Sequence, residues 1–426
     1  MPMENKEEPK IDSTEESEEF SFLQETIKAE PINKKKMANK FMLIALMGLV
    51  FGLFASLGFC AFRPWAESQF QKKSNVVRIP DDEDQKESGI EGEQVPEAIA
   101  PTLDVNSYKE LYFGLTQIVS QANRSMVSVN GIKGGEGWIE DSVKNANGAA
   151  GLIVVDNGQE LLILTESSIL KDAEKWTITF NDGSKYDASL KKKDENLGFA
   201  MLAVNRSSIT EATWSQIQTA VLGNSNTSYR GNPVIAIGNP FGYKNGLGYG
   251  VISSSENKIA FVDGEYDILS TDIPATATGT GALINLNGEI LGIISQGAFK
   301  ENNTNLINAF AISDLKKNIE LLSNGSGVPY LGIKATEVTP EVAEAQRLPK
   351  GLYIKEIVAD SPSMVAGIQS GDILTYVEDS PITSIASYHD ALFKYRVGNE
   401  IELKGMRLGS DGYVDMKYTV TVGSRE

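Results

Sequence analysis

Between residues 125 and 312 the chain is a series of short β-rich runs separated by turn residues, and this pattern limits the possible fold more than any other feature. Val, Ile, Leu and Phe, which strands favour, dominate the runs. The runs are 151–155, 161–164, 176–180, 199–204, 234–238 and 289–295. Asn157-Gly158, Asn181-Asp182-Gly183 and Asn287-Gly288 stand between runs, as expected of hairpin turns that need positive φ. The pattern predicts an all-β barrel or sandwich.

A polar stretch at 323–327, Ser-Asn-Gly-Ser-Gly, interrupts this pattern and opens a second unit. From Tyr330 to the end, short strands mix with helical stretches near 361–368 and 387–395. A chain of 426 residues is expected to contain more than one domain. We therefore place the last domain at 326–426.

An uncharged run at 41–62 is long enough to cross a hydrocarbon core of about 30 Å as a helix. Several lysines stand in 34–40, whereas only Arg63 follows closely, so the positive-inside rule places the N-terminus in the cytoplasm and the later domains outside. A cleaved signal peptide is the alternative, but its charged region would be too long and no A-x-A site follows the run. A lipoprotein signal is disfavoured because bulky Phe59 precedes Cys60. We expect a single-pass protein of the cell membrane.

The segments on either side of this run are acidic and poor in apolar residues. Low hydrophobicity with charge of one sign is typical of disorder. We expect an acidic cytoplasmic tail at 1–40 and a flexible stalk at 63–105. An amphipathic helix through 108–119 then opens the next domain, 106–325, and packs on it.

The charge and the cysteine and histidine counts exclude several classes of function. A formal net charge of -18 argues against nucleic-acid binding, which needs clustered Lys and Arg. Cys60 is the only cysteine and His389 the only histidine. We therefore expect no disulfide in the outer part, which suits a bacterial surface, and no metal site or cofactor.

Separated motifs occur in an order that is specific to one family of proteins. They are 163–165, 180–183, 222–225, 236–242, 250–253, 271–272, 281–289 and 310–312. In this order they resemble the HtrA (DegP-like) family, whose members have a trypsin-like double six-stranded β-barrel followed by a PDZ domain. The resemblance covers roughly residues 120–423. It implies a mainly β fold, with the barrels in 106–325 and an α+β PDZ domain in 326–426.

The three positions that carry catalysis in the family hold other residues here. Family members read I-L-T-N-N-H-V-V at the histidine, whereas this chain reads I-L-T-E-S-S-I-L over 163–170, so Ser168 stands at the histidine position. Gly198 stands at the position of the acid, before F-A-M-L. The nucleophile loop G-N-S-G-G-A-L becomes the shorter T-G-T-G-A-L, which leaves Gly279 or Thr280 in the serine slot. Because triad members act as a unit, we expect no hydrolysis.

Two arrangements could restore a reaction. Thr280 could act as the nucleophile with Lys244 as its base, since a desolvated lysine can lose its proton near neutral pH. Asp194 or Glu195 could act as a displaced acid, but without an imidazole that acid has nothing to orient. The spacing supports neither arrangement, and Ser168 and Thr280 are interpreted as small polar residues that fill vacated space.

A second functional motif opens the last domain. Tyr330, Leu331, Gly332 and Ile333 resemble the carboxylate-binding loop of HtrA-type PDZ domains. In such loops successive backbone N–H groups receive the C-terminal carboxylate of a peptide, which pairs with the adjoining strand edge. Further motifs of the PDZ pattern follow at 351–354, 360–368 and 371–374.

His389 lies in the helix predicted beside the peptide groove. In other PDZ classes a histidine near the start of that helix recognises a ligand hydroxyl, and this is one interpretation. The other interpretation, which we favour, is a solvated residue next to Asp390 with an ordinary pKa near 6.5.

These features predict a membrane-anchored HtrA-like pseudoprotease that serves as a peptide- or protein-binding scaffold or regulator in envelope protein quality control. We expect its PDZ domain to bind unfolded or C-terminal peptides with apolar ends. One alternative is an active membrane-anchored HtrA-type serine endopeptidase with divergent catalytic residues. Another is a chaperone-like or regulatory subunit of active relatives, because family trimers form through an N-terminal segment that the 108–119 helix could replace. Homotrimers and mixed oligomers with active relatives are the assemblies that the resemblance implies.

Overall fold

The computed structural model describes residues 42, 46–47, 104–132, 148–171, 173–302 and 305–426. The chain divides into two units, 1–99 and 100–426. Nearly all of the predicted tail, membrane span and stalk lies outside the described residues. Within the described ranges, no helix is both long enough and apolar enough to span a membrane.

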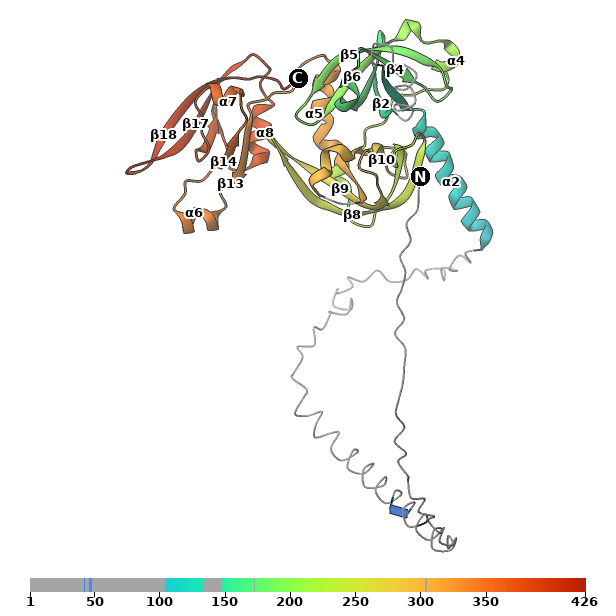
Figure 1. The fold of residues 1–426 in the computed structure, drawn as a ribbon, viewed down its shortest axis with the longest axis horizontal. Helices are drawn as coiled ribbons and strands as arrows, with labels where there is room; N and C mark the ends of the chain where they lie inside the picture. Colours follow the sequence, from blue (N-terminus) through green and yellow to red (C-terminus); the bar gives the residue numbers. More distant parts are fainter. Residues whose placement is uncertain (1–41, 43–45, 48–103, 133–147, 172, 303–304) are drawn as a thin grey trace, which may run out of the picture. The chain divides into compact units, whose positions relative to one another are not determined.

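The first barrel is a closed, antiparallel six-stranded sheet (Figure 1). Its strands are β1 (Met126–Ile132), β2 (Ala149–Asp156), β3 (Glu160–Glu166), β4 (Lys175–Thr179), β5 (Lys185–Asp194) and β6 (Phe199–Asn205), in the order β1-β2-β3-β6-β5-β4. Asn157 begins the turn between β2 and β3, and its side-chain oxygen accepts from the backbone N–H groups of Gln159 and Glu160 at 2.9 and 2.7 Å. Gly158 has φ +86°, so the hairpin predicted from Asn-Gly is confirmed.

The second barrel is closed in the same way. Its strands are β7 (Pro233–Asn239), β8 (Gly246–Phe261), β9 (Gly264–Pro274), β10 (Thr280–Ile284), β11 (Ile290–Ser295) and β12 (Leu306–Ala311), in the order β10-β11-β12-β9-β8-β7. The predicted double six-stranded barrel is therefore confirmed, and each predicted β-rich run falls on a strand to within a residue.

Besides the apolar interior of each barrel, a third core lies between the two. Phe310 is fully buried at its centre. The rings of Phe199, Phe261, Tyr266 and Phe299 surround it, with ring centroids 4.8 to 6.3 Å away. Burial of one such side chain stabilises a fold by roughly 1.5–3 kcal/mol. The contact between the barrels is therefore a strong apolar interface.

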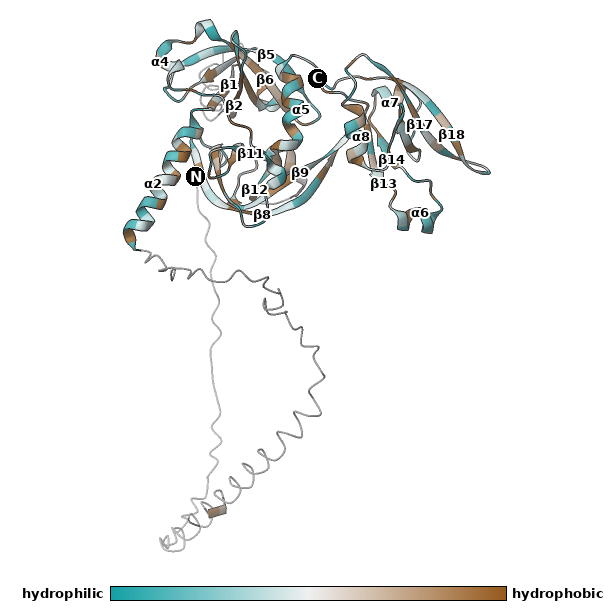
Figure 2. Ribbon diagram, turned by 180° about the vertical axis from the view of Figure 1, so that it is seen from behind, coloured by the Kyte–Doolittle hydropathy of each residue, from teal (hydrophilic) through white to brown (hydrophobic). Residues whose placement is uncertain are grey.

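The longest described helix, α2 (Val105–Asn123), precedes the first barrel. Asp104 caps it by accepting from the backbone N–H groups of Asn106 and Ser107 at 2.9 and 2.8 Å. Only its last turns are buried, at Val119 and Ala122. Its first turns expose Val105, Tyr108, Leu111, Tyr112 and Phe113 to solvent, and Figure 2 shows both hydrophobic and hydrophilic colours along it. The predicted helix is present, but only one half packs on the barrel.

The remaining helices are short. They are α4 (Glu211–Trp214), α5 (Ile312–Ser323), α6 (Pro340–Gln346), α7 (Pro362–Val365) and α8 (Ile385–Leu392), with 3₁₀ turns η2 (Ser167–Leu170), η3 (Arg206–Ser208), η4 (Ser225–Thr227) and η5 (Gln296–Asn302). Helix α7 is shorter than the predicted 361–368 stretch, because Gly367 adopts φ +81° and ends it.

The last domain is an antiparallel sheet with helices α6, α7 and α8. Its strands are β13 (Ile333–Glu337), β14 (Leu352–Ile357), β15 (Ile373–Val377), β17 (Glu400–Gly409) and β18 (Gly412–Thr421), in the order β13-β14-β15-β17-β18, and β16 (Ser380–Pro381) pairs with β15. Because β13 is at an edge of this sheet, one side of it has no partner strand within the sheet.

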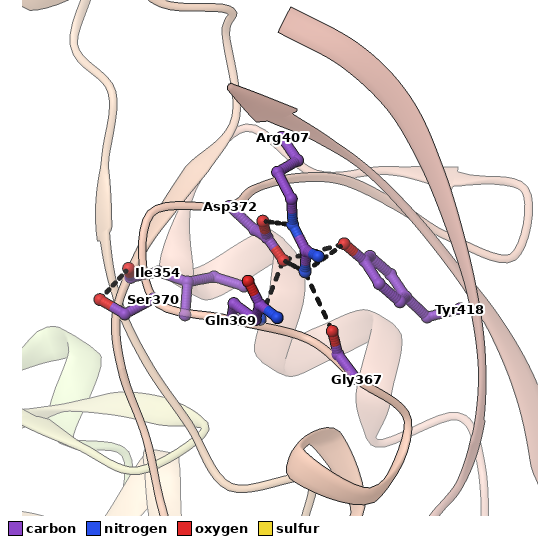
Figure 3. Close-up of polar contacts among 7 residues, drawn as sticks. All are labelled: Ile354, Gly367, Gln369, Ser370, Asp372, Arg407 and Tyr418. Carbon is purple, nitrogen blue, oxygen red and sulfur yellow. Dashed lines mark hydrogen bonds and ion pairs between the residues drawn. The ribbon is translucent and has the colours of Figure 1, made fainter. Parts of the chain in front are cut away.

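A buried carboxylate fixes the tight turn of this domain (Figure 3). Arg407 donates to both oxygens of Asp372 at 2.7 and 2.8 Å, and the Tyr418 hydroxyl donates to one of them at 2.8 Å. Burial alone would raise the pKa of Asp372, but these hydrogen bonds, chiefly those from Arg407, outweigh it and lower that pKa. Arg407 also donates to the Gly367 carbonyl at 2.9 Å. The cluster thus ties the end of α7 and the predicted Gly371-Asp372 turn to β17 and β18.

Candidate functional site

The positions predicted to be equivalent to the triad meet in one cleft of about 770 Å³. Ser168 lies in η2, directly after β3, and Gly198 lies just before β6. Thr280 begins β10 in the second barrel and lines the same cleft. The structure therefore brings into one cleft three residues that motif order had assigned to one site, although they are up to 112 positions apart in the sequence.

The cleft contains a carboxylate that the sequence interpretation missed. Glu166 ends β3, and its two oxygens accept from the hydroxyls of Ser295 and Ser168, the latter at 3.0 Å. Ser295 ends β11, so this cluster joins the two barrels across the cleft. Glu166 is the only acid within 163–170 and lies two residues before Ser168, and that signal could have identified it. The Ser168 hydroxyl thus donates a hydrogen bond to a carboxylate and does not act as a general base, which would have to accept a proton.

Thr280 is held by the main chain. Its hydroxyl oxygen accepts from the backbone N–H of Ala150 in β2 at 2.9 Å, and its side chain is buried. Gly279, the other occupant considered for the serine slot, has no side chain. Its backbone N–H donates to the Thr276 carbonyl at 3.0 Å, and its carbonyl accepts from the Gln296 N–H at 2.9 Å. The N–H of Gly279 is therefore engaged within the loop and is not free to stabilise an oxyanion.

Gly198 has a backbone that disfavours an acid at this position. Its φ is +78°, a left-handed conformation that side chains rarely adopt. The Gly198 carbonyl accepts from the Ser167 N–H at 2.8 Å, which anchors the start of η2. Gly198 therefore shapes the cleft wall with its backbone.

The structure does not bring together the residues of either arrangement that was considered able to restore hydrolysis. Lys244 lines a different cavity, of about 220 Å³, to which Thr280 does not contribute. Asp194 is buried, and burial raises its pKa to about 6. One of its oxygens accepts from the Asn196 N–H at 2.9 Å, so Asp194 holds the turn before β6. Glu195 lines the cleft but pairs with Lys193 at 2.8 Å.

The loop from Tyr330 to Ile333, predicted to bind carboxylates, has converging backbone N–H groups. The backbone N–H groups of Leu331, Gly332 and Ile333 converge on one carboxylate, that of Asp263, at 2.7, 2.7 and 2.9 Å. Gly332 has φ +89°, and a Cβ there would come within 2.2 Å of Ser361. Only glycine therefore lets these N–H groups point the same way. Tyr330 fixes the start of the loop by exchanging backbone hydrogen bonds with Gly423 at 2.9 and 3.0 Å.

The favoured interpretation of His389 is wrong, because the side chain is partly buried rather than solvated. Its Nε2 lies 3.3 Å from the Tyr266 hydroxyl of β9, and its ring packs on Phe393 at a centroid distance of 4.1 Å. Burial lowers the pKa of His389 to about 4, helped by Lys317 and opposed by Asp390. His389 therefore joins α8 to the second barrel as a neutral imidazole.

Comparison with known proteins gives matches to both halves of the described chain. The Trypsin-like peptidase domain model matches residues 149–293, and the PDZ domain model matches residues 329–418. The periplasmic pH-dependent serine endoprotease DegQ of Escherichia coli K12 is 27% identical over 278 residues, covering 64% of this chain and 59% of DegQ. The periplasmic serine endoprotease DegP of the same organism is 26% identical over 294 residues, covering 67% of this chain and 60% of DegP. The chain thus spans about three-fifths of these relatives.

A solved structure of the HtrA-type protease AlgW with a tripeptide is similar in fold. It has a TM-score of 0.52 and 21% sequence identity, and covers 73% of this chain and 97% of that chain. This similarity supports the fold of the chain.

The single histidine allows a direct test of its burial. We expect the imidazole signals in a nuclear magnetic resonance titration of the full chain to change with a midpoint of about 4. Because the folded-state pKa lies below the unfolded value of about 6.5, the folded state loses stability as the pH falls from about 6.5 toward 4. The stability of wild type relative to His389→Gln should therefore decrease over that window. A midpoint near 6.5 would contradict the burial.

Proposed function

We propose that this chain, as a member of the HtrA (DegP-like) family, is a pseudoprotease. It binds peptides or proteins without hydrolysing them. The observation that supports this proposal is the content of the cleft. By motif order, Ser168, Gly198 and Gly279 or Thr280 are predicted to correspond to the family's histidine, acid and serine. Ser168, Gly198 and Thr280 line the cleft. The relatives are named as serine endoproteases, so the absence of hydrolysis is a proposal about this chain alone.

These residues favour binding over cleavage because they lack the groups that acyl transfer requires. Acyl transfer needs a base that removes the proton from the nucleophile and donors that stabilise the oxyanion. In the cleft, Ser168 donates to Glu166 and Thr280 accepts from the main chain. Loss of a triad serine or histidine costs about 10⁶ in kcat. A cleft without these groups can still hold an extended peptide, which suits a scaffold or regulator in envelope protein quality control.

We expect the full chain to release no fragments from casein and to remain unlabelled by a fluorophosphonate probe, with trypsin as the positive control. The physical reason is the missing base, so Thr280→Ala should behave like wild type in both assays. Gel electrophoresis and probe fluorescence measure the outcome. Cleavage that Thr280→Ala abolishes would instead favour the alternative function, an active endopeptidase with divergent residues.

A second alternative, a chaperone-like or regulatory subunit of active relatives, has one observation in its favour. The first turns of α2 expose apolar side chains next to the barrel, including Tyr108 and Phe113. Such a surface is suited to contact with another subunit. Mass measurement of the full chain, alone and mixed with DegQ, separates homotrimers and mixed oligomers from a monomer.

The PDZ domain is proposed to bind peptides with apolar C-termini through the loop from Tyr330 to Ile333. We expect an octapeptide with a free carboxylate to bind at least about tenfold more tightly than its amidated form, because the loop N–H groups make charge-assisted hydrogen bonds. Gly332→Ala should abolish this difference, since its Cβ would collide with Ser361. Gly398→Ala is the matched control, because Gly398 also has positive φ but open space around it. Equal binding of both peptide forms by wild type would reject this role.

We also propose that residues 41–62 anchor the protein in the cell membrane, with 1–40 in the cytoplasm and the later domains extracellular. The support is the sequence: an uncharged run preceded by lysines. The protein should stay with membranes during alkaline carbonate extraction, and protease added to intact cells should digest 106–426 but spare 1–40. Release into the soluble fraction would contradict the anchor.

A further inference from the structure

The tip of the β8–β9 hairpin reaches out of the second barrel to the PDZ domain. Phe261 and Gly264 form the last pair of this hairpin, so Val262 and Asp263 make a two-residue turn. Asp263 has φ +61°, a left-handed conformation that costs most L residues roughly 1–2 kcal/mol. Its side chain is only 4% exposed. Aspartate tolerates this conformation better than most residues, but a charged residue is buried only where other groups compensate for its lost hydration.

The compensating groups belong to the carboxylate-binding loop. One Asp263 oxygen accepts from the N–H groups of Leu331 and Gly332, each at 2.7 Å. The other accepts from the Ile333 N–H at 2.9 Å and from the Tyr388 hydroxyl of α8 at 2.7 Å. In addition, the backbone N–H of Asp263 donates to the Ile333 carbonyl at 2.8 Å. Asp263 thus makes both kinds of contact that a terminal peptide residue makes, a carboxylate on converging amides and a main-chain bond to the edge strand β13.

These contacts leave the loop no N–H group for a second carboxylate. Two carboxylates at one such site would also repel each other, and burial already raises the pKa of Asp263 against the effect of its hydrogen bonds. A peptide C-terminus and Asp263 are therefore mutually exclusive ligands of Leu331, Gly332 and Ile333.

The hairpin tip also contacts the cleft. Phe261 lines the cleft between the barrels, and the Val262 carbonyl accepts from the side chain of Asn196, another cleft residue, at 2.8 Å. His389 also contacts Tyr266. Tyr266 belongs to the same hairpin as Asp263, and His389 belongs to the same PDZ helix as Tyr388. The hairpin tip therefore contacts both the PDZ loop and the wall of the cleft.

We propose that Asp263 is a built-in ligand of the PDZ loop, and that a peptide C-terminus binds only after it displaces the hairpin tip. This proposal rests on the proposed peptide-binding function and adds its regulation. The apparent affinity for a peptide is then the intrinsic affinity reduced by the fraction of molecules in which the loop is open.

The test uses Asp263→Asn in the full chain. Asparagine tolerates the left-handed backbone, so the turn is kept while the charge is lost. A fluorescein-labelled octapeptide that ends in three apolar residues and a free carboxylate should bind this variant about tenfold or more tightly than wild type, since hydrogen bonds to a charged group are the strong ones. Tyr388→Phe, which removes one donor to Asp263 and leaves the hairpin intact, should give a smaller gain. Glu265→Gln is the matched control, because it removes a charge from the same hairpin away from the loop, where Glu265 pairs with Lys258 at 3.4 Å.

Hydrogen exchange at Leu331, Gly332 and Ile333 gives a readout that needs no peptide. Exchange of these amides should be about tenfold or more faster in Asp263→Asn than in wild type or Glu265→Gln. Unchanged exchange would overturn the built-in ligand, and so would carboxylate-dependent peptide binding of equal strength in wild type and Asp263→Asn. Faster exchange without carboxylate-dependent binding by any variant would retain the built-in ligand and reject the peptide-binding function.

Discussion

The packing of aromatic rings around Phe310 is the interaction on which the rest of this structure depends. Phe199 of the first barrel meets Phe261 and Phe299 of the second against that ring, so a dry core joins the barrels. The cleft exists because two closed barrels meet along this core and leave a recess beside it. Tyr266 extends the same packing to the PDZ domain through His389. Cleft, hairpin and PDZ contact therefore share one apolar interface.

Most of the strands that the sequence predicted as β-rich runs are largely buried, whereas two largely exposed strands were missed. Strands β6 and β11 are apolar almost throughout, and they read as β-rich runs. Strand β5, with three consecutive lysines, and the long β8 are largely exposed, so periodicity did not reveal them. Their positions follow from barrel closure, which needs a partner for every edge. Closure is a property of the whole sheet and has no local signature.

Motif order assigned Ser168, Gly198 and Thr280 to one site, and the three residues line one cleft. The prediction is possible because a shared fold fixes where each motif lies. Motif order did not reveal the contact of Glu166 with Ser295 or the contacts of Asp263 with the PDZ loop, which join residues 129 and 68 to 70 positions apart in the sequence. His389 was misjudged for the same reason. Its helix has an ordinary amphipathic pattern, and only the tertiary contact with Tyr266 buries the ring. Side chains whose environment is set by another domain are not predictable from local pattern.

Asp263 is attached to the protein whose loop it fills, and this gives the PDZ domain an affinity threshold. A tethered ligand acts at a fixed effective concentration, commonly in the millimolar range for short flexible links. Every polypeptide ends in a carboxylate, so a permanently open loop would be filled by whichever C-termini are most abundant. A ligand without a carboxylate cannot compete with this tethered group, and among ligands that have one the carboxylate itself gives no advantage. Only the side chains next to the terminus then decide which ligands are retained, and discrimination arises from competition within the chain itself.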